Sequence, residues 1–170
     1  ATGENMEHFM AAITRVLKQY QPDGLYFDGQ YIDSPAALYA LARQTRALLG
    51  ENGILEWHST AALGYGLCYL PQADAYVDFV LRGEGQQSQY GNFDYMRYFV
   101  SGYNVHNSIG VLCNNGPPQL NSELVSSVLR ANARLHTLAG AFPDKEVMEV
   151  LREDYRVRLT PQLRAVVDRE

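Results

Sequence analysis

Three carboxylates in this chain stand in or just beyond short apolar runs. Asp28 follows the run Gly24–Phe27, Glu56 lies inside a second run, and Glu84 stands between two glycines after a third. Short apolar and aromatic runs bounded by turn residues are typical of buried strands. An ionised carboxylate is costly to bury unless it is paired. Each of the three is therefore expected to belong to a polar network or to act on a substrate.

Two carboxylates that face one crevice can hydrolyse a glycosidic bond, because one donates a proton to the leaving oxygen and the other acts as nucleophile or base. Asp28 and Glu84 are the expected pair, and Glu56 is a third catalytic candidate. Separations of about 5–5.5 Å favour retention and about 6.5–9.5 Å favour inversion, and the sequence leaves both open. Each residue also has a structural explanation: an Asx turn for Asp28, an ion pair for Glu56 and a solvated turn for Glu84.

Aromatic and polar side chains near the same run ends are candidates for binding a sugar. Aromatic faces with polar handles suit the C–H faces and hydroxyls of sugars. An arginine at this place could bind a substrate oxygen or lower the pKa of a neighbouring carboxylate. Loop packing for the aromatics and a surface ion pair for the arginine are the alternatives. The predicted substrate-binding residues are Trp57, His58, Arg82, Tyr90 and Asn114.

Helices and strands alternate along the chain. Apolar residues recur at helical spacing from Met6 to Tyr20, and Ser34 followed by Pro35 is a strong helix start. Predicted strands cover residues 24–29, 53–57, 74–81 and 108–113. Predicted helices cover residues 6–20, 35–49, 93–100, 122–138 and 144–156, with another short one after Pro161.

This alternation predicts an α/β fold with a parallel sheet and right-handed crossovers. About four strand–helix units form half of a (β/α)8 TIM barrel, whose usual length is about 250 residues. The expected arrangement is a single domain over residues 1–170 that belongs to a larger barrel, and a small open α/β sheet is the alternative. In both folds the working residues lie at the carboxyl ends of the strands.

Composition excludes several classes of partner. The formal net charge is −5 and the basic residues are scattered, which argues against a nucleic-acid or anionic-membrane surface. No apolar stretch is long enough to cross a membrane. No signal peptide is visible, but the chain begins at Ala1 without a methionine, so the compartment stays open.

The cysteines and histidines show no metal-ligand spacing. The two cysteines, Cys68 and Cys113, are expected to be small buried apolar residues or a single bridge. The expected chemistry therefore needs no metal and no cofactor.

The run Gly24-Leu25-Tyr26-Phe27-Asp28-Gly29 resembles the nucleophile strand of retaining (β/α)8 glycoside hydrolases, such as the alpha-L-fucosidases with their W-F-D-G-like strand end. Residues 54–60, 74–85 and 108–116 are similar to bacterial barrels related to glycoside hydrolase family 123. The resemblance implies the carboxyl-terminal half of a barrel, with Asp28 as nucleophile and Glu84 as acid/base. Family 123-type enzymes use an adjacent Asp-Glu pair, which no strand end here provides, so the resemblance does not extend to their substrate-assisted mechanism.

The expected function is a glycoside hydrolase that acts on a carbohydrate substrate. The alternative is a non-catalytic carbohydrate-binding or scaffold module on the same fold, because fold alone does not determine function. A small α/β protein without a sugar role is a third hypothesis. Half a barrel exposes its first and last strands, so the missing half or a second copy of the chain is the expected partner.

Overall fold

The computed structural model describes residues 3–28, 34–58, 70–102, 108–114, 120–137 and 145–158. Within them lies a parallel sheet whose strands are neighbours in chain order, β1-β2-β3-β4-β5. The strands are β1 (Gly24–Phe27), β2 (Ile54–His58), β3 (Phe79–Arg82), β4 (Ile109–Asn114) and β5 (Arg134–Thr137). The predicted α/β class is confirmed. This order has no reversal of the kind that doubly wound sheets contain, and the half-barrel remains a prediction.

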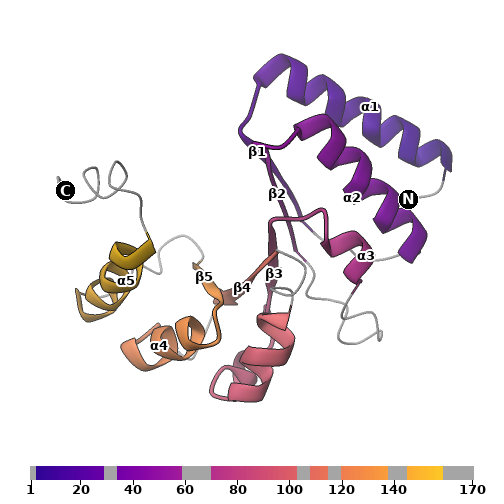
Figure 1. Ribbon diagram of the computed structural model, residues 1–170. Coiled ribbons are helices and arrows are strands. Elements are labelled where there is room, and N and C mark those ends of the chain that lie inside the picture. The colour runs from indigo at the N-terminus through magenta and orange to yellow at the C-terminus, as the bar shows by residue number, and fades with distance from the viewer. Residues whose placement is uncertain are drawn as a thin grey trace.

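Helices flank the sheet. Figure 1 shows the strands near the centre, with α1 and α2 packed together on one flank and α4 and α5 packed together on the other. The helices are α1 (Gly3–Tyr20), α2 (Pro35–Leu49), α3 (Pro71–Asp74), the 3₁₀ helix η2 (Gln87–Gln89), the π-helix η3 (Tyr95–Val100), α4 (Ser122–Arg130) and α5 (Lys145–Arg158). No helix in the described ranges is both long and apolar enough to cross a membrane. The predicted helix after Pro161 lies outside these ranges.

Local sequence signals explain the start of two helices. The Ser34 hydroxyl accepts a hydrogen bond from the amide of Ala37 at 3.4 Å, and Pro35 occupies the first turn of α2, as predicted. Asn121 caps α4 in the same way, with its side-chain oxygen 2.8 Å from the amide nitrogen of Leu124. Both caps satisfy amide groups that have no partner inside the helix.

Two predicted elements were wrong. The predicted strand over residues 74–81 begins only at Phe79, because Pro71–Asp74 forms a helical turn that the Asp74 carboxylate closes on the amide of Leu70 at 3.2 Å. The predicted helix over residues 122–138 ends at Arg130. The chain then turns through Asn132, whose φ is 57°, and enters β5. β5 was not predicted, because its sequence is mostly polar and strands were predicted from apolar runs.

The two faces of the sheet have different surroundings. Leu55 and Val80 belong to the core against α1 and α2, together with Phe27. On the opposite face, Leu81, Val111 and Cys113 form a second apolar cluster. Because side chains alternate along a strand, this second face, called the inner face below, also carries Tyr26, Asp28, Glu56, His58, Phe79, Ile109, Arg134 and His136.

Asp78 sets the register of the strands at the amino edge of the sheet. Its amide donates to the carbonyl of Leu55 at 2.8 Å, and its carboxylate accepts from the amide of Leu55 at 2.7 Å. The carbonyl of Asp78 accepts from the amide of Ile109 at 2.7 Å, which connects the start of β4. Arg46 of α2 pairs with the same carboxylate and donates to the carbonyls of Tyr76 and Gly53.

Replacing Asp78 by alanine should therefore lower the free energy of unfolding by about 2 kcal/mol, since hydrogen bonds to charged groups contribute about 1.5–3 kcal/mol each. The measurement is urea denaturation followed by circular dichroism. Asp78→Asn is the matched variant, because it retains an acceptor for the Leu55 amide and should lose less. Equal losses for the two variants would contradict the role of that backbone contact.

Gly110 of β4 lets the strand approach the end of the π-helix. A Cβ atom at Gly110 would lie 1.8 Å from the carbonyl oxygen of Val100 and 3.0 Å from the Cα of Ser101. Such distances are impossible without moving backbone, so only glycine fits.

We expect Gly110→Ala to destabilise the fold by about 3 kcal/mol or more, at the upper end of the cost of overpacking. The measurement is thermal or urea unfolding. Gly102→Ala is the matched control, because a Cβ atom there would meet no atom of the described residues, its chain neighbours aside, within 4 Å. A Gly110→Ala variant as stable as this control would contradict the close packing.

Candidate functional site

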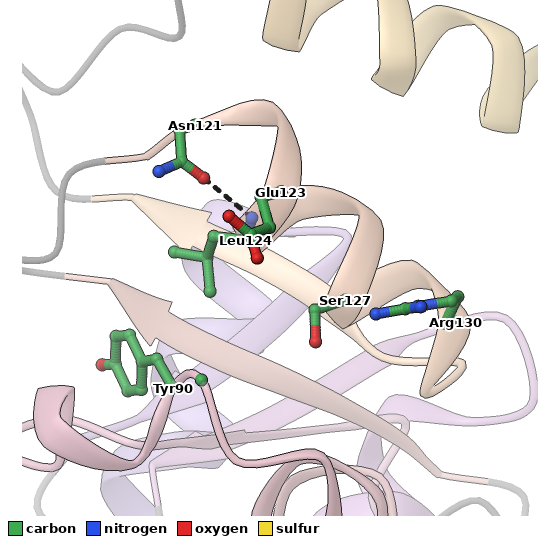
Figure 2. A pocket seen from close by; sticks show the side chains of 7 residues that line it. Tyr90, Asn121, Glu123, Leu124, Ser127 and Arg130 are labelled. Atoms are coloured by element: carbon green, nitrogen blue, oxygen red, sulfur yellow. Dashed lines mark hydrogen bonds between the residues drawn. The ribbon is translucent and has the colours of Figure 1, made fainter.

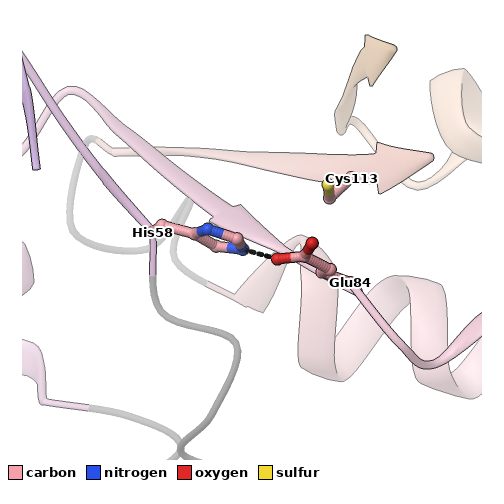
Figure 3. Close-up of side chains that lie close together, drawn as sticks. All are labelled: His58, Glu84 and Cys113. Carbon is pink, nitrogen blue, oxygen red and sulfur yellow. Dashed lines mark ion pairs between the residues drawn. The ribbon is translucent and has the colours of Figure 1, made fainter. Parts of the chain in front are cut away.

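A histidine joins the two predicted catalytic carboxylates at the carboxyl edge of the sheet. His58, the last residue of β2, places Nδ1 3.0 Å from Oδ1 of Asp28 and Nε2 3.3 Å from Oε2 of Glu84. Figure 3 shows the imidazole and Glu84 facing each other, with Cys113 of β4 beside them. The prediction that strand ends would bring Asp28, His58 and Glu84 together agrees with this geometry.

The three side chains differ in their access to solvent. His58 is buried, with 7% of its side chain exposed, whereas the side chains of Asp28 and Glu84 are 75% and 44% exposed. A neutral imidazole carries one N–H and can donate to only one of the two carboxylates. The second ring nitrogen faces the other carboxyl group, which can donate to it when that group is protonated. The arrangement is therefore suited to sharing protons among three groups.

Tyr26 adds a fourth group that sequence reasoning did not single out. Its hydroxyl donates to Oδ1 of Asp28 at 3.4 Å, and its ring stacks on the His58 ring with centroids 6.5 Å apart. Burial, followed by the negative charge of Asp28, raises the pKa of Tyr26, so the hydroxyl remains a donor. The i,i+2 spacing of Tyr26 and Asp28 on one strand was the available signal.

Glu56 lies on the same inner face but two residues before His58 along β2. It is half-buried, and burial raises the pKa of its carboxyl group, an effect opposed by His136 and His58. In register, Glu56 is beside Tyr26 of β1. The third predicted catalytic carboxylate thus faces the inner side of the sheet, where the charge of the same imidazole acts on it.

The turn that carries Glu84 needs glycine on both sides. Gly83 has a φ of 100° and Gly85 a φ of 75°, a region that side chains disfavour. A Cβ at Gly83 would also lie 2.7 Å from Cδ1 of Leu112. The glycines thus shape the backbone under Glu84.

Tyr90 connects this turn to β4. Its side chain is fully buried, and its hydroxyl donates to the carbonyl of Gly83 at 2.9 Å and also contacts the carbonyl of Cys113. Burial raises the pKa of Tyr90, which preserves the donor. A fully buried ring cannot stack on a sugar, so the predicted substrate contact of Tyr90 is not supported. Its position fits a residue that fastens the Glu84 turn to β4.

Three other predicted substrate-binding residues point away from the inner face. Trp57 is buried in the core that includes Ala73, and Arg82 is 1% exposed with its guanidinium carbon 4.5 Å from the centroid of the Phe99 ring. Asn114 is buried at the end of β4, one residue after the inward-facing Cys113. The alternation along each strand places these side chains toward the helices.

A cavity of about 250 Å³ lies elsewhere, between the segment after η2 and α4. Figure 2 shows Tyr90 on one side of it and Asn121, Leu124 and Arg130 on the other. It is smaller than most small-molecule sites, which measure about 300–1,000 Å³. Neither Asp28 nor His58 nor Glu84 lines it.

Cys113 is a second residue that the site prediction missed. Its sulfur, a ring nitrogen of His58 and a carboxylate oxygen of Glu84 all lie within 4.8 Å of one another. Cys113 is buried, and burial, followed by the charges of Glu84 and Asp28, raises the pKa of its thiol to about 11. Cys68 lies outside the described residues. No sequence spacing relates His58, Glu84 and Cys113, because each comes from a different strand–helix unit.

Asp74 is a buried carboxylate behind the site. It is 3% exposed, and burial raises its pKa to about 6, an effect opposed by the hydrogen bond from the Leu70 amide, by Arg82 and by the Trp57 indole. A carboxyl group whose pKa is higher in the folded state binds more protons there than in the unfolded chain. Its contribution to stability therefore falls as the pH rises from about 4 to about 6.

Replacing Asp74 by asparagine removes this dependence and retains an acceptor for the Leu70 amide. Relative to the wild type, the variant should gain about 2 kcal/mol in free energy of unfolding between pH 4 and pH 7. Urea denaturation at several pH values measures the difference. A difference that does not change with pH would contradict the burial of the charged form.

No protein-family model, curated protein or solved structure matches this chain. The resemblance to glycoside hydrolases therefore remains a hypothesis that depends on its short motifs. The chemistry open to the chain follows from the geometry of Asp28, His58, Glu84 and their neighbours.

Proposed function

We propose that this chain is part of a glycoside hydrolase in which Asp28 and Glu84 are the catalytic carboxylate pair. The observation that supports the proposal best is that both carboxylates contact opposite nitrogens of one buried imidazole at the carboxyl ends of neighbouring strands. Working residues of α/β folds gather at this edge. Both carboxylates also reach solvent, as residues that meet a polymer or oligosaccharide must.

The separation of the pair is compatible with this chemistry. The two carboxylates lie no farther apart than the width of one imidazole ring and two contacts of 3.0 Å and 3.3 Å. That span falls within the range of about 5–9.5 Å over which carboxylate pairs of glycosidases operate. Retention and inversion both remain open within this range.

Each group then has a defined task. His58 donates a hydrogen bond from Nδ1 to ionised Asp28, and its Nε2 accepts one from protonated Glu84. One proton on the imidazole and one on Glu84 are then enough for both hydrogen bonds. Glu84 transfers its proton to the leaving oxygen as the glycosidic C–O bond breaks. Asp28 attacks the anomeric carbon in the retaining route, or removes a proton from the attacking water in the inverting route.

The strand order supports the proposed barrel. The strands are parallel and are neighbours in chain order, which is also the order of strands in a (β/α)8 barrel. Inner-face side chains of alternate strands meet, since the ligating atoms of His58 in β2 and Cys113 in β4 lie within 4.8 Å of each other. The missing wall would come from the rest of the barrel or a second copy of the chain.

A non-catalytic carbohydrate-binding module is the second candidate. It is favoured by the same contacts, because both carboxylates have a partner in His58 and a structural network would have this form. In such a module the pair would hold the strand ends together, and hydrolysis would not depend on it.

The pair is tested by measuring hydrolysis of a panel of chromogenic glycosides by the wild type, Asp28→Asn and Glu84→Gln. Each substitution should lower kcat/KM by about 10³-fold, within the range for loss of a positioned acid or base. Glu84→Gln should retain more activity on aryl glycosides whose leaving groups need no protonation. In the retaining route, added azide should give a glycosyl azide of retained configuration with Glu84→Gln, by attack on the glycosyl-enzyme, and one of inverted configuration with Asp28→Asn, by direct attack on the substrate.

Glu51→Gln is the matched control, because Glu51 is an exposed carboxylate in the turn before β2, at the opposite edge of the sheet. It should hydrolyse like the wild type. Circular dichroism checks that all variants fold. Wild-type rates in folded Asp28→Asn and Glu84→Gln would reject the catalytic pair and favour the binding module.

A further inference from the structure

Three side chains that can ligate a metal ion converge from three strand ends. The ligating atoms of His58, Glu84 and Cys113 all lie within 4.8 Å of one another, and Figure 3 shows Glu84 and Cys113 on the same side of the His58 ring. We propose that His58, Glu84 and Cys113 bind one zinc ion. This inference goes beyond the proposed hydrolysis and does not depend on it.

The donor set identifies the metal. One imidazole, one carboxylate and one thiolate are the three ligand types that zinc accepts in proteins. Magnesium and calcium take oxygen ligands, so a set containing sulfur and nitrogen disfavours both of them. The set favours zinc, or cobalt as its spectroscopic substitute.

The spacing of the ligands needs little adjustment. Zinc binds nitrogen and oxygen at about 2.0–2.2 Å and sulfur at about 2.3 Å in a tetrahedron, so neighbouring ligand atoms are about 3.5 Å apart. In this structure the three ligand atoms lie within 4.8 Å of one another. Glu84 is the half-exposed member on a turn, and rotation of its side chain could close the difference. His58 and Cys113 are buried on strands and supply fixed positions.

The Asp28 carboxylate orients the imidazole of His58 as a second carboxylate does for zinc-binding histidines. A zinc-binding histidine almost always donates its second N–H to a carboxylate, a carbonyl or water. The Asp28 carboxylate lies 3.0 Å from Nδ1 of His58, which leaves Nε2 directed at Glu84. The hydroxyl of Tyr26 donates in turn to Asp28. Asp28 is therefore a positioning residue for the metal ligand.

Zinc binding displaces the thiol proton of Cys113, which passes to solvent as the Zn–S bond forms. Three protein ligands leave the fourth position of the tetrahedron to water. An ion at this place takes Glu84 as a ligand, so the same residue cannot donate a proton to a substrate at that moment. Zinc occupancy and hydrolysis by the Asp28–Glu84 pair are therefore mutually exclusive.

The test measures binding of Zn²⁺ alone to protein stripped with a chelator, by competition with a chromogenic zinc indicator. One equivalent should bind tightly to the wild type. His58→Asn and Cys113→Ser should each weaken binding by about 100-fold or more, and Asp28→Asn by about 10–100-fold, the usual effect of losing an outer hydrogen-bond partner. His8→Asn, at an exposed position of α1, is the matched control and should bind like the wild type.

Co²⁺ provides a readout on the wild type that does not depend on the stability of any variant. It should give the visible bands of tetrahedral cobalt and a thiolate-to-cobalt charge-transfer band, and Cys113→Ser should remove the latter. Absence of that band in the wild type, or unchanged zinc affinity in folded His58→Asn and Cys113→Ser, would overturn the site. Because no substrate is present, failure of the proposed hydrolysis leaves this result unaffected.

Discussion

The register of β2, β3 and β4 is the constraint on which the candidate site depends. Asp78 holds these strands together at the amino edge, through paired contacts with Leu55 and a contact with Ile109. A slip of one residue along a strand would turn every side chain to the opposite face. His58 would then face the helices, and Asp28 and Glu84 would lose their common partner. Contacts at one edge of the sheet thus decide which residues meet at the other.

A second constraint acts at the carboxyl edge itself. Glu84 is on a turn rather than a strand, so register alone does not place it. The positive φ of Gly83 and Gly85 bends the backbone, and the buried hydroxyl of Tyr90 ties the carbonyl of Gly83 to the end of β4. This anchoring gives a half-exposed carboxylate a defined position relative to His58, which a freely solvated turn would not.

Proton sharing and metal binding use the same geometry in different ways. In both, Asp28 holds Nδ1 of His58 and so determines what Nε2 can do. A protonated Glu84 makes the site an acid–carboxylate pair, whereas a cation between Nε2, Glu84 and the Cys113 sulfur makes it a metal centre. The two proposals therefore differ in what lies between the imidazole and the facing carboxylate, a proton in one and a metal ion in the other.

The sequence by itself determined the α/β class, the capped start of α2 and the run ends at which Asp28, His58 and Glu84 stand, because glycines, caps and apolar runs are local signals. It misplaced the start of β3 and missed β5, where a side-chain contact of Asp74 and a polar strand contradict the apolar pattern. Only the tertiary structure decided that His58 faces inward while Trp57 and Arg82 face the helices. That choice depends on which face the helices cover, and the meeting of Cys113 with His58 depends on the pairing of β2, β3 and β4. Neither is encoded in local spacing.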